Sequence, residues 1–175
     1  MHYLTYYKII LFTVFLFLPS CSLPVRLADN IGAIHENCFA KGKNENSSDK
    51  FSTYITCFNK NIDEFAGDQD YDLTKIFALK GKTLDDQIKR KIITSKYAAE
   101  SLDKEFELLI ISIIAREIPR LQLMQEIYAQ AAQSLSNTPQ NGWVGAMQGF
   151  YQGTYYALRA REIEYRNYLI SKGYQ

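Results

Sequence analysis

The residues of this 175-residue chain best suited to chemistry are a histidine and two cysteines. His35 and Cys38 lie three positions apart, which places an imidazole and a sulfur on the same face of a helix. Cys57 is a third candidate ligand for a metal such as zinc. A tetrahedral site needs three or four converging ligands, and the only other histidine is His2. We therefore expect no metal and no cofactor, and the same shortage of histidine argues against a Cys–His catalytic pair.

Acidic residues are the other group with chemical potential. Asp68, Asp70 and Asp72 have the alternating spacing of calcium ligands. An EF-hand loop also requires glycine at its sixth position and a carboxylate at its twelfth, where this chain has Leu73 and Leu79. We interpret the segment as an acidic turn whose last aspartate caps a helix.

Catalytic motifs are otherwise absent from the sequence: there is no Gly-x-Ser-x-Gly and no His-Glu-x-x-His. Gly81-Lys82-Thr83 matches only the end of a phosphate-binding loop, because Ile76 occupies the first glycine position. The chain is therefore not expected to be an enzyme. A cell-wall-acting enzyme that uses carboxylates stays as an alternative, since a glycosidase needs only two acids and Glu105, Glu107 and Glu117 are available.

The first 20 residues have the pattern of a secretory signal peptide. Residues 9–18 form an uncharged, mostly apolar run that is too short to span a bilayer. The run ends in Leu18-Pro19-Ser20-Cys21, in which Leu18 and Ser20 match the lipobox of bacterial lipoproteins. The alternative is an ordinary signal peptide cut near Ser20, which would leave a soluble periplasmic or secreted protein.

The lipobox resemblance implies that the signal is removed ahead of Cys21 and that this cysteine carries a lipid (palmitate-type acyl chains) that anchors the protein. Ser22, next to it, implies the outer membrane, on its periplasmic face. With Cys21 assigned to the anchor, Cys38 and Cys57 remain as a pair in an oxidising compartment, which implies one disulfide. Closing a loop of that length would stabilise the fold by about 3 kcal/mol.

The charge of the exported chain is balanced. Removing residues 1–20 takes away Lys8 and no acid, so the 20 basic residues become 19 and equal the 19 acidic ones. A chain without a basic stripe is not expected to bind nucleic acid. We expect residues 21–27 to form a lipidated tether and residues 28–175 to form a single helical domain.

Apolar residues recur with the helical period along the exported chain, which predicts an all-α bundle of about five or six helices. A first helix is predicted over residues 29–39. A second begins at Ser48 or Asp49. Its apolar stripe is Phe51, Ile55, Phe58, Ile62 and Phe65.

Glycine, threonine and proline set the remaining predicted boundaries. A short helix over residues 73–80 is predicted to end at Gly81, with Thr83 capping a long amphipathic helix that starts at residue 84. Pro119 is expected to kink or break that helix. Thr138 is then predicted to cap, and Pro139 to begin, the last helix of a C-terminal hairpin. The stripe of the long helix suits packing within a monomer or a weak homodimer.

The hairpin is unusual because residues 127–158 contain no charged residue and no histidine. On its last helix Gly145, Gly149, Gly153 and Ala157 recur every four residues, although each glycine costs about 1 kcal/mol of helix propensity relative to alanine. Close packing against the alanine-rich stretch 129–132 is the favoured explanation. An exposed groove for a foreign helix or chain is the alternative.

Aromatic side chains surround these glycines, and they cannot all point inward. Amphipathic aromatic residues without charge are typical of protein interfaces. The predicted partner-binding residues are Trp143, Gly145, Gly149, Phe150, Tyr151, Gly153, Tyr155 and Tyr156.

The sequence thus predicts an outer-membrane lipoprotein that binds another envelope protein. This description is similar in architecture to helical pilotin lipoproteins, which bind a helix of a secretion-system pore, and to periplasmic immunity proteins, which block a toxin. A peripheral membrane-binding protein is an alternative, although few lysines and arginines lie near the aromatic residues.

Overall fold

The computed structural model describes residues 26–42, 47–139 and 141–174. These ranges contain five α-helices and no strand, which confirms the all-α prediction. The helices are α2 (Leu27–Gly42), α3 (Ser47–Ile62), α4 (Tyr71–Lys89), α5 (Ser95–Ser136) and α6 (Gly142–Ser171), and a short 3-10 turn, Asp63–Phe65, follows α3. The predicted signal peptide and Cys21 lie outside the described residues.

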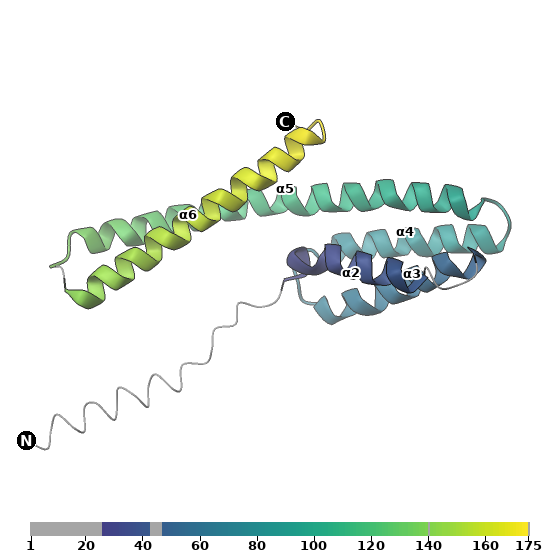
Figure 1. Ribbon diagram of the computed structural model, residues 1–175, viewed down its shortest axis with the longest axis horizontal. Helices are drawn as coiled ribbons and strands as arrows, with labels where there is room; N and C mark the ends of the chain where they lie inside the picture. Colours follow the sequence, from purple (N-terminus) through teal and green to yellow (C-terminus); the bar gives the residue numbers. More distant parts are fainter. Residues whose placement is uncertain (1–25, 43–46, 140, 175) are drawn as a thin grey trace, which may run out of the picture.

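The helices form two connected parts (Figure 1). Helices α2, α3 and α4 pack with the first half of α5, and we call this part the four-helix region. Helix α6 folds back along α5, and the outer part of this pair, residues 121–158, extends beyond the four-helix region as a two-helix hairpin. The hairpin therefore has only two helices with which to bury its side chains.

An aromatic core holds the four-helix region together. Four residues of the stripe predicted for α3 are buried, Phe51, Ile55, Phe58 and Ile62, whereas the fifth, Phe65, lies in the 3-10 turn after α3 and is partly buried. The Phe58 ring meets the Phe77 ring of α4 at a centroid distance of 4.9 Å. The predicted disulfide between Cys38 and Cys57 is present and joins α2 to α3, with the two Cα atoms 5.5 Å apart. The disulfide therefore adds a covalent link between α2 and α3 to the apolar packing of the two helices.

The predicted boundary at Gly81 is wrong, because α4 continues through this residue to Lys89. A Cβ atom at Gly81 would lie 2.2 Å from Cδ1 of Ile55, so the glycine lets α4 approach α3 closely. The capping role predicted for Thr83 is also wrong: Thr94 caps α5 by accepting a hydrogen bond from the Tyr97 N–H at 3.2 Å. The predicted long helix from residue 84 is therefore the end of α4 and the start of α5.

Proline does not set the boundaries of α5 and α6 as predicted. Helix α5 runs from Ser95 to Ser136 as one element that contains Pro119. Helix α6 begins at Gly142 rather than at Pro139, and Thr138 is not its cap. Its cap is Asn141, whose side-chain oxygen accepts a hydrogen bond from the Val144 N–H at 2.9 Å.

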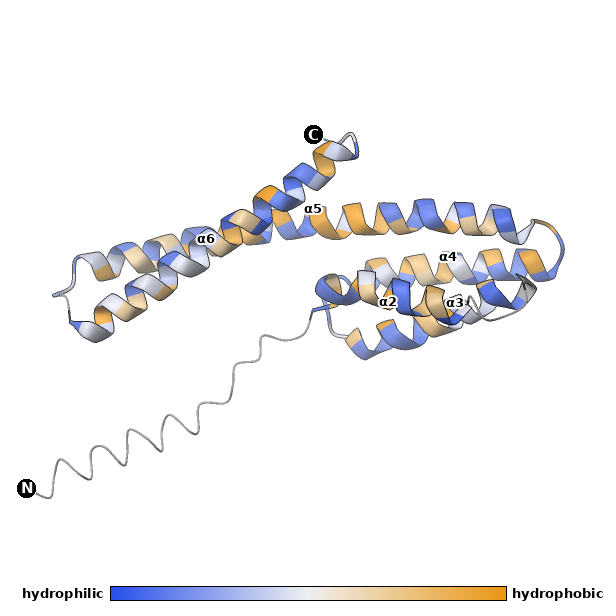
Figure 2. Cartoon of the chain, viewed as in Figure 1, coloured by the Kyte–Doolittle hydropathy of each residue, from blue (hydrophilic) through white to orange (hydrophobic). Residues whose placement is uncertain are grey.

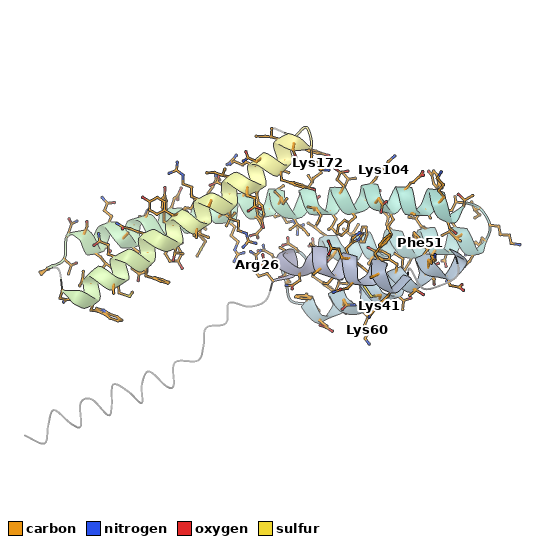
Figure 3. All side chains as sticks on the ribbon, viewed as in Figure 1. Arg26, Lys41, Phe51, Lys60, Lys104 and Lys172 are labelled. Atoms are coloured by element: carbon orange, nitrogen blue, oxygen red, sulfur yellow. A yellow bond between two sulfur atoms is a disulfide. The ribbon has the colours of Figure 1, made fainter. Side chains whose placement is uncertain are left out.

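A buried polar network fixes the start of α2 where the hairpin leaves the four-helix region (Figure 3). The Arg26 guanidinium forms a two-point hydrogen bond with Glu117 of α5, one arm of which measures 2.6 Å. The Gln69 amide donates a further hydrogen bond of 2.6 Å to the same carboxylate. Burial alone would raise the pKa of Glu117, but the hydrogen bonds and charge of Arg26 outweigh it and hold the pKa below its usual value.

Candidate interaction surface

The two arms of the hairpin meet along a narrow apolar seam. Leu121 and Ala132 of α5 and Val144 of α6 are buried in it. Further along, the Tyr128 and Tyr151 rings lie 6.0 Å apart. Closer to the four-helix region, the amides of Gln122 and Gln125 donate hydrogen bonds of 3.0 and 2.7 Å to the Glu162 carboxylate. Apolar packing within the uncharged segment 127–158, together with the hydrogen bonds to Glu162 beyond it, holds α6 against α5.

The glycines of α6 do not lie in this seam, so the predicted close packing against residues 129–132 is wrong. Gly145, Gly149, Gly153 and Ala157 are all exposed. Among the described residues, and apart from the adjoining turns of α6 itself, no atom lies within 4 Å of the place where a Cβ atom at Gly149 or Gly153 would be. The reason is helical geometry: Val144, Tyr151 and Leu158 recur every two turns on the α5 side, which turns the glycines to the opposite side.

The five predicted aromatic residues divide between the two sides of α6. Tyr151 and Tyr155 are half-buried. Trp143, Phe150 and Tyr156 are exposed by 67, 60 and 65%. These three and the glycines form what we call the outer face of α6, which consists of Trp143, Gly145, Gly149, Phe150, Gly153 and Tyr156. Exposed aromatic rings beside exposed backbone are features that a second helix or an extended chain can pack against.

Three exposed apolar residues beside this surface were not predicted as site residues. Leu123 and Ile127 lie one turn apart on α5, and Ile163 lies on α6. Leu123 and Ile127 do not fall on the predicted core stripe of the long helix. Their positions off that stripe could have indicated in advance that these apolar side chains would be exposed. Both arms of the hairpin therefore expose apolar side chains, and Figure 2 shows mostly pale, intermediate hydropathy over the outer part of the hairpin.

The metal site considered for His35, Cys38 and Cys57 is not formed, because both sulfurs belong to the disulfide. His35 instead places Nδ1 2.7 Å from the Tyr54 hydroxyl. No group of three metal-ligating side chains occurs in the part of the chain that the structure describes.

The acidic turn is held by local hydrogen bonds and arginine. Asp68 accepts hydrogen bonds from the backbone N–H groups of Leu27 and Asp70, at 3.0 and 2.9 Å. Asp72 pairs with Arg116 of α5 through two hydrogen bonds of 2.7 and 2.9 Å. Asp70, rather than Asp72, occupies the residue before α4. The turn thus joins α4 to α5 and to the start of α2.

The three glutamates of the carboxylate-enzyme alternative each pair with a different cation. Glu105 pairs with Lys80, and Glu117 pairs with Arg26. Glu107 lies 2.6 Å from Lys172 at the end of α6. These pairs link α5 to α4, to the start of α2 and to α6, so all three acids have structural contacts across elements.

Among the described residues, no helix combines the length and the apolar character needed to cross a membrane. No protein-family model matches the chain, and comparison with curated proteins and with solved structures gave no match.

Proposed function

We propose that this protein is a lipid-anchored component of the bacterial envelope that binds another envelope protein through the outer face of α6. The observation that carries the proposal is the exposure of Gly145, Gly149 and Gly153. Each glycine costs about 1 kcal/mol of helix stability relative to alanine, and no contact with another described residue requires a glycine at position 149 or 153. A contact outside the chain accounts for them.

The chemistry of the outer face favours a neutral partner surface. Trp143, Phe150 and Tyr156 supply exposed rings, and residues 127–158 carry no charge. Interfaces of this kind are held by apolar burial and by polar tips of aromatic rings. A helix or chain with small and aliphatic side chains fits such a surface, and its binding should change little with ionic strength.

The position of Arg26 supports a role close to a membrane. If Cys21 carries the anchor, the chain from Cys21 to Arg26 spans at most about 18 Å when fully extended. Arg26 is held by Glu117 at the base of the hairpin. An acylated Cys21 would therefore keep the base of the hairpin near the membrane while the outer face of α6 stays available to a partner.

The test is capture of crosslinked partners from envelope extracts with the wild-type protein and two variants. Gly149→Leu places a branched side chain in the middle of the outer face, whereas Gly32→Leu makes the same change at an exposed glycine of α2 that also has open space around it. We expect one protein to be recovered by the wild type and by Gly32→Leu, and at least about tenfold less of it by Gly149→Leu.

Equal recovery of that protein by Gly149→Leu, with its helical content intact, contradicts the proposed surface. Mass spectrometry of the same preparations reads the mature N-terminus. A first residue other than an acylated Cys21 contradicts the anchor and leaves the binding result to be judged separately.

A further inference from the structure

An apolar cavity of about 350 Å³ lies between α2, α3 and α5, at the end of α2 far from Arg26. Its walls include Phe39 of α2, Phe51 and Tyr54 of α3, and Ala99 and Leu102 of α5. Figure 3 shows Phe51 between α5 and the α2–α3 pair. The volume lies within the range of about 300–1,000 Å³ that is typical of small-molecule pockets.

The cavity results from small residues where the helices diverge. Gly42, Ser95 and Ala99 line it, so three helix positions contribute almost no side-chain volume. Deeper in the same region, the His35 ring stacks on the Phe106 ring of α5 at 4.0 Å and spaces α2 from α5.

Polar groups converge on the cavity from its wall and its mouth. In the wall, the His35 imidazole and the Tyr54 hydroxyl pair at 2.7 Å. Lys50, Lys96 and Asp103 also line the cavity and are exposed, which places two cations and one anion at its mouth. Burial lowers the pKa of His35, so the imidazole is neutral at pH 7. Lys96 lies 3.9 Å from Glu100 of its own helix, and both lysines are exposed enough to turn toward an anionic group at the mouth.

We propose that this cavity binds a small amphiphile, whose apolar ring or chain lies against Phe51, Leu102 and Phe39 and whose anionic head lies beside Lys50 and Lys96. The site is separate from the hairpin and stands independently of the function proposed for it. The Phe39 ring, which stacks on the His35 ring at 6.3 Å, is 56% exposed and offers apolar surface to such a ligand.

The test is a titration of the purified protein with two probes, decanoate as a chain and 2-naphthoate as a ring. The proton resonances of the His35 ring report binding at the cavity and are distinct from those of Trp143, which report binding at the hairpin. We expect at least one probe to shift the His35 resonances saturably with one site per chain, and the stronger probe identifies the apolar body as chain or ring.

Two matched variants locate the site. Ala99→Phe fills the cavity from an exposed position of α5, and Ala115→Phe makes the same change at an exposed position of α5 that does not line the cavity. We expect Ala99→Phe to weaken binding about tenfold or more and Ala115→Phe to leave it unchanged. Ser95→Leu fills the same cavity and replaces Ala99→Phe should that variant unfold by circular dichroism.

The head group is tested by the double variant Lys50→Gln, Lys96→Gln and by decanol as an uncharged probe. The double variant should weaken decanoate and leave decanol unchanged. The proposal is overturned if neither probe shifts the His35 resonances saturably, if the cavity-filling variants bind as well as the wild type, or if the double variant binds decanoate unchanged.

Discussion

Two buried carboxylates at the base of the hairpin, Asp70 and Glu117, have pKa values shifted in opposite directions. Glu117 accepts the two-point hydrogen bond of Arg26, which holds its pKa below the usual value against the effect of burial. Asp70 is fully buried, and neither of its oxygens accepts a well-formed hydrogen bond. Burial and the neighbouring charge of Asp68 raise the pKa of Asp70, since Arg26 and Arg116 approach it only to 3.9 Å.

Replacement of Glu117 by glutamine should destabilise the protein at pH 7. The substitution removes the charge that pairs with Arg26 and should lower the free energy of unfolding by about 2 kcal/mol. Because the folded-state pKa of Glu117 is depressed, its contribution is present above the unfolded pKa of about 4.3 and is lost as the pH falls through the folded pKa. Urea unfolding across this pH range should therefore show the variant and the wild type converging in acid.

Replacement of Asp70 by asparagine should have the opposite sign. The raised pKa means that ionised Asp70 opposes folding at neutral pH, and this cost falls as the pH drops through the raised pKa. Asp70→Asn should therefore increase the free energy of unfolding at pH 7 by about 1 kcal/mol, with the gain shrinking towards pH 4. A loss of stability at pH 7 would show that Arg26 and Arg116 stabilise the ionised carboxylate after all.

At the scale of elements, the junction between α4 and α5 depends on a strained residue. Lys91 has a φ of 59°, in the left-handed region. Its N–H bonds to the Ile88 carbonyl, and the Ile92 N–H bonds to the Gln87 carbonyl, both at 2.9 Å. This is the hydrogen-bond pattern that ends many helices, in which glycine usually occupies the left-handed position. Helix α6 ends in the same way with Gly173, whose φ is 85°.

Lys91→Gly should stabilise the protein by about 1 kcal/mol, because glycine adopts this conformation without the steric cost of a Cβ atom. Thermal unfolding followed by circular dichroism measures the change. Lys82→Gly is the matched control within α4, where glycine should instead lower stability by about 1 kcal/mol. Equal loss of stability in both variants would contradict a strained Lys91.

The whole molecule combines a well-packed region with a thinly packed one. The four-helix region has a continuous core that reaches from α2 to α5, closed by the Cys38–Cys57 disulfide. The hairpin buries few large side chains, and among the described elements its main contacts are those between α5 and α6. Local opening requires the least free energy where few apolar contacts are lost.

Hydrogen exchange should reveal this difference. Backbone amides of residues 127–158 should take up deuterium well before those of residues 98–113 in α5, measured by mass spectrometry on the native protein. Addition of the partner captured through the outer face of α6 should slow exchange in the hairpin selectively. Uniform protection along α5 would contradict a separately opening hairpin.

Sequence patterns predicted the structure correctly where a feature depends only on residues within the same helix. The stripe of Phe51, Ile55 and Phe58 predicted a buried face of α3, because the side chains of one helix face follow directly from the helical period. The Cys38–Cys57 disulfide was predicted only on the assumption that Cys21 carries a lipid.

Most of the wrong predictions concern residues whose role depends on contacts with another helix. Gly81 and Gly149 carry the same local signal, yet Gly81 is buried against Ile55 of α3 while Gly149 faces outward. The α4–α5 junction was missed because Lys91 occupies the position where glycine is usual. His35 beside Tyr54 and the cavity at Ala99 likewise arise from three helices brought together.

The sequence by itself determined that the chain is helical, which residues line the core of α3, and that the hairpin is uncharged, because periodicity and composition are properties of contiguous residues. Only the tertiary structure decided which side of α6 meets α5, where Arg26 is held, and where small residues leave a cavity. These depend on how helices pack in space, and a helix can present any of its faces to a neighbour until the complete set of side chains selects one.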